Sequence, residues 1–142
     1  MSETKVTISV SGDPASQGSH AIMNGRIVQV NSKKHKAWRT AIVSTCIDEL
    51  PKDWVALDEP VELIVNFYMP KPKSVDRPLP SVAPDLDKLV RAVGDALAIA
   101  GVYTDDSRIV RISARKLYAQ GIEPGATISV RTICDTPINE NN

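Results

Sequence analysis

The sequence predicts a single α+β domain in which a mixed β-sheet packs against two main helices. Its length of 142 residues fits one ordinary domain of roughly 100–200 residues. Apolar residues make up 42% of the chain and charged residues 24%, which is enough to build a core. Segments with a strand period alternate along the chain with segments that have a helix period. We place the domain at residues 1–136 and a C-terminal tail at residues 137–142.

The N-terminal half predicts a strand, a hairpin and a helix. Lys5–Ser11 alternates apolar and polar residues, as a half-buried strand does. Asn24 and Gly25 predict a hairpin turn, because both residues tolerate positive φ. From about Ser32 to Leu50, apolar residues recur at helical steps of three and four. The first turn of this helix is basic, which a bound anion and the simple solvation of exposed lysines explain equally well.

A strand and a basic loop are expected next. Val61–Met69 alternates cleanly and predicts the most regular strand of the chain. Residues 70–84 hold half of the ten prolines. Because proline removes backbone donors and restricts the preceding residue, this segment predicts an irregular, exposed loop. Its bases are Lys71, Lys73 and Arg77.

The remaining elements are a second helix and two strands. Residues 85 to about 100 predict a helix with an apolar stripe, and Gly101 ends it. A closing pair of strands is expected at Ile109–Tyr118 and Thr127–Cys134, joined across residues 121–125.

Composition and the absence of targeting signals argue against several classes of protein: membrane-embedded, secreted and disulfide-rich proteins. No window has the roughly 18 uncharged apolar residues of a membrane span, and the start of the chain lacks the pattern of a signal peptide. We therefore expect a protein that is neither secreted nor membrane-embedded. Cys46 and Cys134 are too few for a disulfide framework and are expected to be buried free thiols. His20 and His35 are expected at the surface, because a metal site would need more ligands.

Charge is balanced in total but segregated along the chain. Seventeen acids and seventeen bases cancel, so net charge gives no argument for a polyanionic partner. Two stretches, residues 14–47 and 107–122, contain no acid at all. Segregated charge can bind an anion despite a neutral total. The bases of these stretches are Arg26, Lys33, Lys34, Lys36 and Arg39, and then Arg108, Arg111, Arg115 and Lys116.

Two pairs of acids lie at element boundaries: Asp85 with Asp87 where the loop enters the second helix, and Asp105 with Asp106 after that helix. A helix of sixteen residues is roughly 24 Å long, so residues 101–106 must fold back if the pairs share a site. Clustered carboxylates suit a hard cation such as Mg²⁺, which can activate water and stabilise a phosphoryl group. Ordinary capping and turn chemistry is the alternative.

A polar face is also predicted on the second helix. Asp87, Arg91 and Asp95 follow one another at spacings of four, so they share one side. Two surface ion pairs explain this spacing. A functional face, with Arg91 near a phosphate and Asp95 orienting it, explains it equally well.

The runs PDLDKLVRAVGDAL at 84–97 and GVYTDDSRIV at 101–110 resemble the RusA family of Holliday junction resolvases. The N-terminal half is similar in outline. The resemblance implies a small, dimeric, magnesium-dependent endonuclease of phage or prophage type that nicks four-way DNA junctions symmetrically, with Mn²⁺ as a substitute for Mg²⁺. It also implies a cytoplasmic location in a bacterial host cell.

By this resemblance, the essential metal-binding and catalytic acids fall on Asp85, Asp87 and Asp106. Asp105 and Asp95 match acidic family positions with supporting roles. Arg91 stands where the family has an essential lysine; arginine keeps the charge but does not readily give up a proton. Lys88 replaces an asparagine that is common after the second acid, which affects the metal geometry.

We therefore predict a Mg²⁺-dependent endodeoxyribonuclease that resolves Holliday junctions in DNA recombination and repair. Paired nicks in a nearly twofold junction suggest a homodimer. The alternatives are a nuclease that prefers flaps or forks and a non-catalytic module that binds branched DNA; a purely structural phage protein ranks third. The predicted DNA-binding residues are Lys33, Lys34, Lys36, Arg39, Lys71, Lys73, Arg77 and Arg108.

Overall fold

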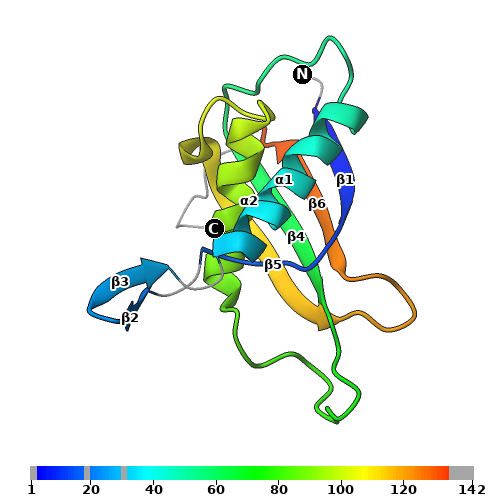
Figure 1. The fold of residues 1–142 in the computed structure, drawn as a ribbon. Coiled ribbons are helices and arrows are strands. Elements are labelled where there is room, and N and C mark those ends of the chain that lie inside the picture. Colours follow the sequence, from blue (N-terminus) through cyan, green and yellow to red (C-terminus); the bar gives the residue numbers. More distant parts are fainter. Residues whose placement is uncertain (1–2, 18–19, 30–31, 135–142) are drawn as a thin grey trace, which may run out of the picture.

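The computed structural model describes residues 3–17, 20–29 and 32–134. A four-stranded mixed sheet, a separate two-stranded hairpin and two main helices make up this part of the chain, so the predicted α+β class is confirmed (Figure 1). The predicted tail at residues 137–142 lies outside the described residues. The elements are β1 (Lys5–Ser11), β2 (His20–Met23), β3 (Arg26–Gln29), α1 (Ser32–Glu49), β4 (Val61–Met69), α2 (Leu86–Ile99), the short 3₁₀ helix η1 (Asp106–Arg108), β5 (Ile109–Tyr118) and β6 (Gly125–Thr132).

The sheet has the strand order β1-β6-β4-β5. β6 is antiparallel to both of its neighbours, whereas β4 and β5 are parallel. Parallel strands need a crossover connection, and the segment that contains α2 supplies it. The prediction that the last two strands form a closing pair is wrong, because β6 inserts between β1 and β4. β6 also begins two residues earlier than predicted, at Gly125.

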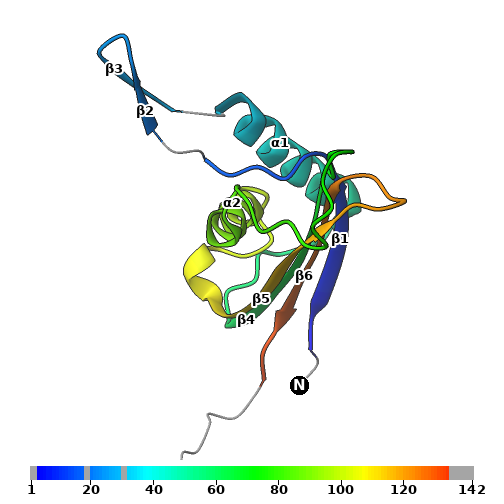
Figure 2. The ribbon, with the colours of Figure 1, turned by 90° about the horizontal axis from the view of Figure 1, so that it is seen from below.

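Both helices cover the same face of the sheet, and the core lies between them and the sheet (Figures 1 and 2). The alternation of β4 turns every second residue toward the helices, and α2 presents its apolar stripe in return. The two predicted apolar patterns are thereby confirmed. The larger buried apolar side chains of these elements are Val61, Leu63, Val65, Phe67 and Met69 of β4, Leu89, Val93 and Leu97 of α2, and Trp38, Ile42 and Cys46 of α1.

The β2–β3 hairpin projects away from this body (Figure 2). Its turn has positive φ at Asn24 (52°) and Gly25 (76°), which confirms the prediction made from this residue pair. The basic segment between β4 and α2 contains no helix or strand and is mostly exposed, also as predicted.

The other face of the sheet carries polar contacts. The Thr7 and Ser129 hydroxyls are hydrogen-bonded at 2.9 Å across β1 and β6. Glu62 is 8% exposed and accepts hydrogen bonds from Arg111 on one side and Arg131 on the other. Because both guanidiniums stabilise its charged form, the pKa of Glu62 lies below its usual value. The buried carboxylate is therefore compensated on both sides.

The structure confirms one expectation about cysteine and histidine and corrects two. Cys46 is buried as predicted, and burial raises its pKa to about 11. Cys134 is exposed instead of buried, because it follows the end of β6. His35 is half-buried instead of exposed, because it precedes Trp38 by three positions and shares the inward side of α1. Among the described residues, no helix is long and apolar enough to cross a membrane.

Candidate active site

Asp85 occupies the N-cap position of α2, but its carboxylate makes no capping hydrogen bond. Its backbone is extended, with φ −68° and ψ 139°. The side chain is 60% exposed, and the Nζ of Lys88 lies 3.7 Å from one of its oxygens. The sequence thus predicts correctly that Asp85 lies where the loop enters α2. The side-chain hydrogen bond that an N-cap aspartate usually accepts is absent. The carboxylate is therefore available to a ligand that arrives from solvent.

Lys116 of β5 holds the segment that leads into Asp85. Its Nζ donates hydrogen bonds to the carbonyl oxygens of Val82 at 2.7 Å and Pro84 at 2.9 Å. In the sequence alone, Lys116 is only one base of an acid-free stretch. Its contact could not be predicted, because it joins residues more than thirty positions apart.

The predicted polar side of α2 is present, but its ion pairs are not. Asp87, Arg91 and Asp95 are all exposed. In the described part of the chain, no carboxylate oxygen lies within the 4.0 Å of an ion pair from the Arg91 guanidinium. The charge of Arg91 is still close enough to oppose the rise in the pKa of Asp95. The lack of ion pairs to Arg91 supports a functional role for this side of α2 more than it supports stabilisation by surface ion pairs.

The segment after α2 folds back along the helix, as expected. Gly101 takes a positive φ of 79°, and the Tyr103 hydroxyl donates a 2.7 Å hydrogen bond to the Gly94 carbonyl oxygen. This return brings Asp106 next to Asp95. Partial desolvation of its carboxylate by neighbouring atoms raises the pKa of Asp95, and hydrogen bonding with Asp106 and the charge of Asp106 raise it further. Asp95 and Asp106 therefore form an acidic pair beside the C-terminal half of α2.

Asp105 serves local structure. Its carboxylate accepts a 2.9 Å hydrogen bond from the backbone N–H of Ser107 at the start of η1, and hydrogen bonding with the Ser107 side chain and then with this N–H lowers its pKa. Arg108, a predicted DNA contact, donates a 2.8 Å hydrogen bond to Asp58 before β4. Hydrogen bonds from Arg108 and Thr104 lower the pKa of Asp58. The contact of Asp105 is therefore the ordinary turn chemistry that the sequence offers as the alternative to metal binding. The Arg108 guanidinium forms an ion pair with Asp58 of the same chain.

The acids predicted to bind metal fall into two places. Asp87 and Asp95 are eight positions apart, which is about 12 Å of helix rise, so Asp106 lies well away from Asp85 and Asp87. Within the described ranges, no three His, Cys, Asp or Glu residues are close enough together to hold a metal ion. Mg²⁺ is commonly held by one or two carboxylates, with waters and substrate phosphates completing its shell. Two exposed carboxylates in the first turn of α2 fit that donor set.

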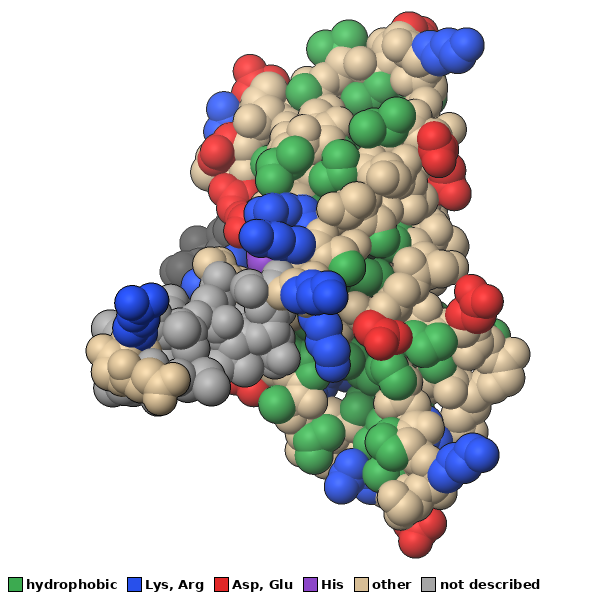
Figure 3. All heavy atoms as spheres, viewed as in Figure 1, with side chains coloured by type: hydrophobic (Ala, Val, Ile, Leu, Met, Phe, Trp, Pro, Cys, Tyr) green, Lys and Arg blue, Asp and Glu red, His purple; other side chains and the backbone are tan. Residues whose placement is uncertain are grey.

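Predicted DNA-binding bases surround the start of both helices. Lysine and arginine side chains gather over this region, with acidic side chains beside them (Figure 3). The lysines at the beginning of α1 are exposed and Arg39 is half-buried. This surface offers positive charge next to the polar side of α2. The exposed lysines are Lys33, Lys34 and Lys36.

Two bases of the proline-rich loop, which is the segment 70–84 between β4 and α2, converge on Tyr118 at the end of β5. Arg77 donates a 3.1 Å hydrogen bond from Nη1 to the Tyr118 hydroxyl. The Nζ of Lys71 lies 5.9 Å from the centre of the same ring, within cation–π range. Lys73 is exposed on the same loop. Sequence reasoning identified the three bases but missed Tyr118, because no local pattern marks it.

Comparison with known proteins assigns the family. None of the curated proteins matches the chain. The family model described as endodeoxyribonuclease RusA matches residues 11–131, which is most of the chain and includes both acidic pairs. Enzymes of this family act on Holliday junctions. The chain belongs to the RusA family and is an endodeoxyribonuclease that hydrolyses phosphodiester bonds.

Proposed function

We propose that the protein resolves four-way DNA junctions by a pair of symmetric nicks and depends on Mg²⁺, with Mn²⁺ as a substitute. The observation that carries the proposal is the exposed polar side of α2, where acids flank Arg91 and basic segments lie on both sides. A strand of DNA that follows this side meets Asp85 and Asp87 first, then Arg91, then Asp95 with Asp106.

Each residue on this side has a distinct role in the proposal. Asp85 and Asp87 would hold the ion. Bound Mg²⁺ would supply activation of a water molecule and stabilisation of the charge that develops on the phosphate. Asp106 is the third essential acid, and Asp95 supports it through the contact described above. Arg91 binds the scissile phosphate, since a guanidinium can donate two hydrogen bonds to it.

Supporting residues position this machinery. Lys88 lies 3.7 Å from Asp85 and limits the repulsion between the first two acids. Asp105 caps η1 and thereby orients the residue that follows it. The bases at the start of α1 and in the proline-rich loop bind the DNA backbone, which makes binding dependent on salt. These bases are Lys33, Lys34, Lys36, Arg39, Lys71, Lys73 and Arg77.

The proposed active unit is a homodimer. One active site cuts one strand at a time, whereas a four-way junction has two equivalent strands related by a near-twofold axis. Two copies related by the same symmetry place one site on each strand.

The test is cleavage of an immobile synthetic four-way junction by the parent, Asp85→Asn and Asp87→Asn, resolved on a denaturing gel. We expect symmetric nicks by the parent with Mg²⁺, none with EDTA, and a loss of at least about 100-fold in both variants. Asp76→Asn, which changes an exposed acid of the proline-rich loop, is the matched control and is expected to cut normally. Cleavage by the two site variants at the parental rate contradicts the proposal.

The same assay separates the alternatives. Faster cutting of flaps or forks in competition at equal concentration favours a nuclease for other branched DNA. Structure-selective binding without any nick, at every Mg²⁺ concentration, favours the binding module. The specific observation in favour of this second candidate is Arg91, which lacks the readily transferred proton of the family lysine.

A further inference from the structure

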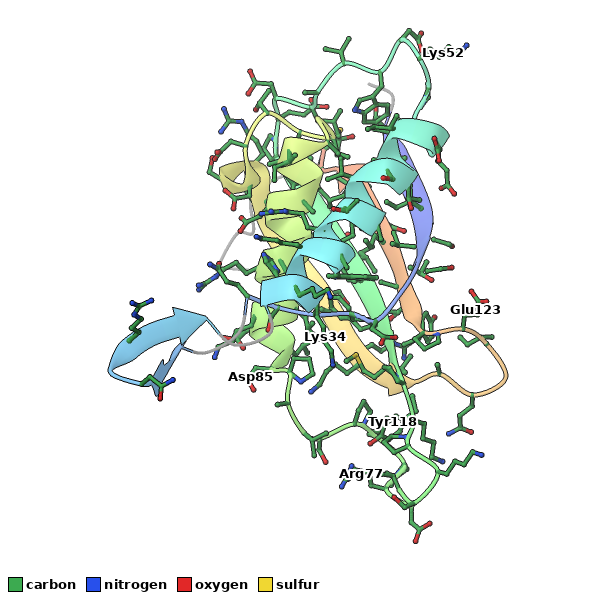
Figure 4. The ribbon with its side chains drawn as sticks, in the orientation of Figure 1. Lys34, Lys52, Arg77, Asp85, Tyr118 and Glu123 are labelled. Atoms are coloured by element: carbon green, nitrogen blue, oxygen red, sulfur yellow. The ribbon has the colours of Figure 1, made fainter. Side chains whose placement is uncertain are left out.

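A cavity of about 490 Å³ opens beside Asp85. Its walls come from the start of α1, the start of α2, the end of β5, the proline-rich loop and the segment after β1. Lys34, Asp85, Arg77 and Tyr118 lie on this side of the molecule, and Lys52 lies at the opposite end (Figure 4). The volume falls within the range of about 300–1,000 Å³ that small-molecule ligands occupy.

The lining divides into an apolar part and a charged rim. Ala15, Met69 and Pro80 are buried and contribute apolar surface. The exposed bases of the lining are Lys34, Arg77 and Lys88, against the two acids Asp13 and Asp85. Since Lys88 already neighbours Asp85, the other two bases remain to meet an anion. A ligand with an apolar ring and a negative group matches these walls.

The cavity walls are held by contacts within the protein. Lys116 binds the carbonyl oxygens of Val82 and Pro84, and both of these residues line the cavity. Arg77 is held by the Tyr118 hydroxyl at 3.1 Å. A pre-formed site loses less entropy when it binds its ligand. These contacts therefore favour a binding site over a gap between loops.

We infer that the cavity receives one unstacked nucleotide of the DNA strand, next to the phosphate that is cut. Its base enters the apolar part, and its phosphate meets Lys34 and Arg77. The inference rests on the proposed function, because Asp85 borders both the cavity and the proposed metal site. A base that is not fully paired or stacked costs less to extrude, and a branch point offers such bases. The cavity thereby sets which base is preferred at the nick.

The experiment places 2-aminopurine at successive positions around the branch of a synthetic four-way junction. Fluorescence is measured with Ca²⁺ in place of Mg²⁺, and binding is measured by anisotropy on the same samples. For the parent we expect fluorescence to rise at least about twofold at one position, because the base leaves the stack. Val82→Trp fills the cavity from its exposed wall and is expected to abolish the rise while junction binding persists.

The matched control is Val55→Trp, which adds the same side chain at a 79% exposed residue between α1 and β4. It is expected to keep the fluorescence rise. If Val82→Trp does not fold, as judged by its thermal unfolding, Ala83→Trp on the same wall takes its place. The absence of any rise in the parent overturns the inference, and so does an undiminished rise in the cavity variant.

Cleavage rates give a second readout. Varying the base at the responsive position is expected to change the parental rate by about tenfold or more, and the rate of the cavity variant much less. If the parent binds junctions but never nicks them, the proposed function fails while the fluorescence result still decides what the cavity binds.

Discussion

Lys116 donates a 2.9 Å hydrogen bond from Nζ to the carbonyl oxygen of Pro84, so the end of β5 holds the residue that precedes Asp85. A second bond, to Val82, completes the attachment. The Asp85 side chain makes no capping hydrogen bond, and its carbonyl oxygen accepts a 3.0 Å hydrogen bond from the Leu89 N–H, so Lys116 holds the segment before Asp85 while α2 holds the segment after it. Lys116 is thus a positioning residue for the first acid of the proposed site.

Lys116→Met is expected to lower kcat for junction cleavage about ten- to hundredfold with little change in KM, because the acid shifts while the DNA-binding bases stay. Lys116→Arg is expected to recover part of the rate, since it can still donate to both carbonyl oxygens. Steady-state kinetics check this, with Lys52→Met at the opposite end of the molecule as the control (Figure 4). An unchanged kcat in Lys116→Met would rule out the positioning role.

Arg91→Gln is expected to reduce the single-turnover cleavage rate by about 10²–10³, as the loss of one group that stabilises developing charge does. Arg91→Lys is expected to stay within about tenfold of the parent if the role is electrostatic. Anisotropy on the same junction serves as the binding control. A large gain in rate with lysine would show instead that proton transfer is the role of this position.

Lys73 and Arg108 are expected to differ in their effect on salt dependence. Lys73 is exposed on the proline-rich loop, so Lys73→Gln should reduce the slope of log K against log salt by about 0.7–0.9. Arg108 is engaged by Asp58, so Arg108→Gln should leave the slope unchanged and lower the melting temperature. Binding titrations at several salt concentrations measure the slope for each variant. If Arg108→Gln reduces the slope as much as Lys73→Gln does, Arg108 also contacts DNA.

Glu62→Gln is expected to lower the melting temperature at pH 7, because Arg111 and Arg131 lose their shared partner. The pKa of Glu62 is depressed in the folded state, so its stabilisation is present above the unfolded pKa of about 4.3 and is lost as the pH falls through the folded value. The gap in melting temperature between parent and variant should therefore close below about pH 4. Thermal melts from pH 3 to 7 test this, and a constant gap would contradict it.

Two glycine substitutions should have opposite effects. A Cβ at Gly94 would meet the Tyr103 hydroxyl at 3.7 Å, an ordinary contact, so Gly94→Ala should stabilise α2 by about 0.5–1 kcal/mol. A Cβ at Gly125 would lie 2.0 Å from the carbonyl oxygen of Val10 in the neighbouring strand, so Gly125→Ala should be clearly destabilising. Denaturant unfolding of both variants checks the signs; a destabilised Gly94→Ala would mean that the fold-back segment cannot tolerate the added methyl group.

The sequence by itself determined the approximate residues of the main helices and strands and the buried side of β4 and α2. The alternation in β4 and the apolar stripe of α2 report burial directly, because side chains repeat every two residues in a strand and every three to four in a helix. Asn24 and Gly25 determined the hairpin turn for a similarly local reason. The runs around Asp85 and Asp106 were enough to indicate the family that residues 11–131 match.

Only the tertiary structure decided which elements become neighbours. The period of β6 does not encode its place between β1 and β4, so the expected pairing with β5 was wrong. Likewise, the length of α2 showed that the chain had to fold back, but not that Asp106 would stop beside Asp95. The attachment of Pro84 by Lys116 and the cavity beside Asp85 join residues that are far apart in sequence. Such contacts depend on how whole elements pack, which no local repeat of residues specifies.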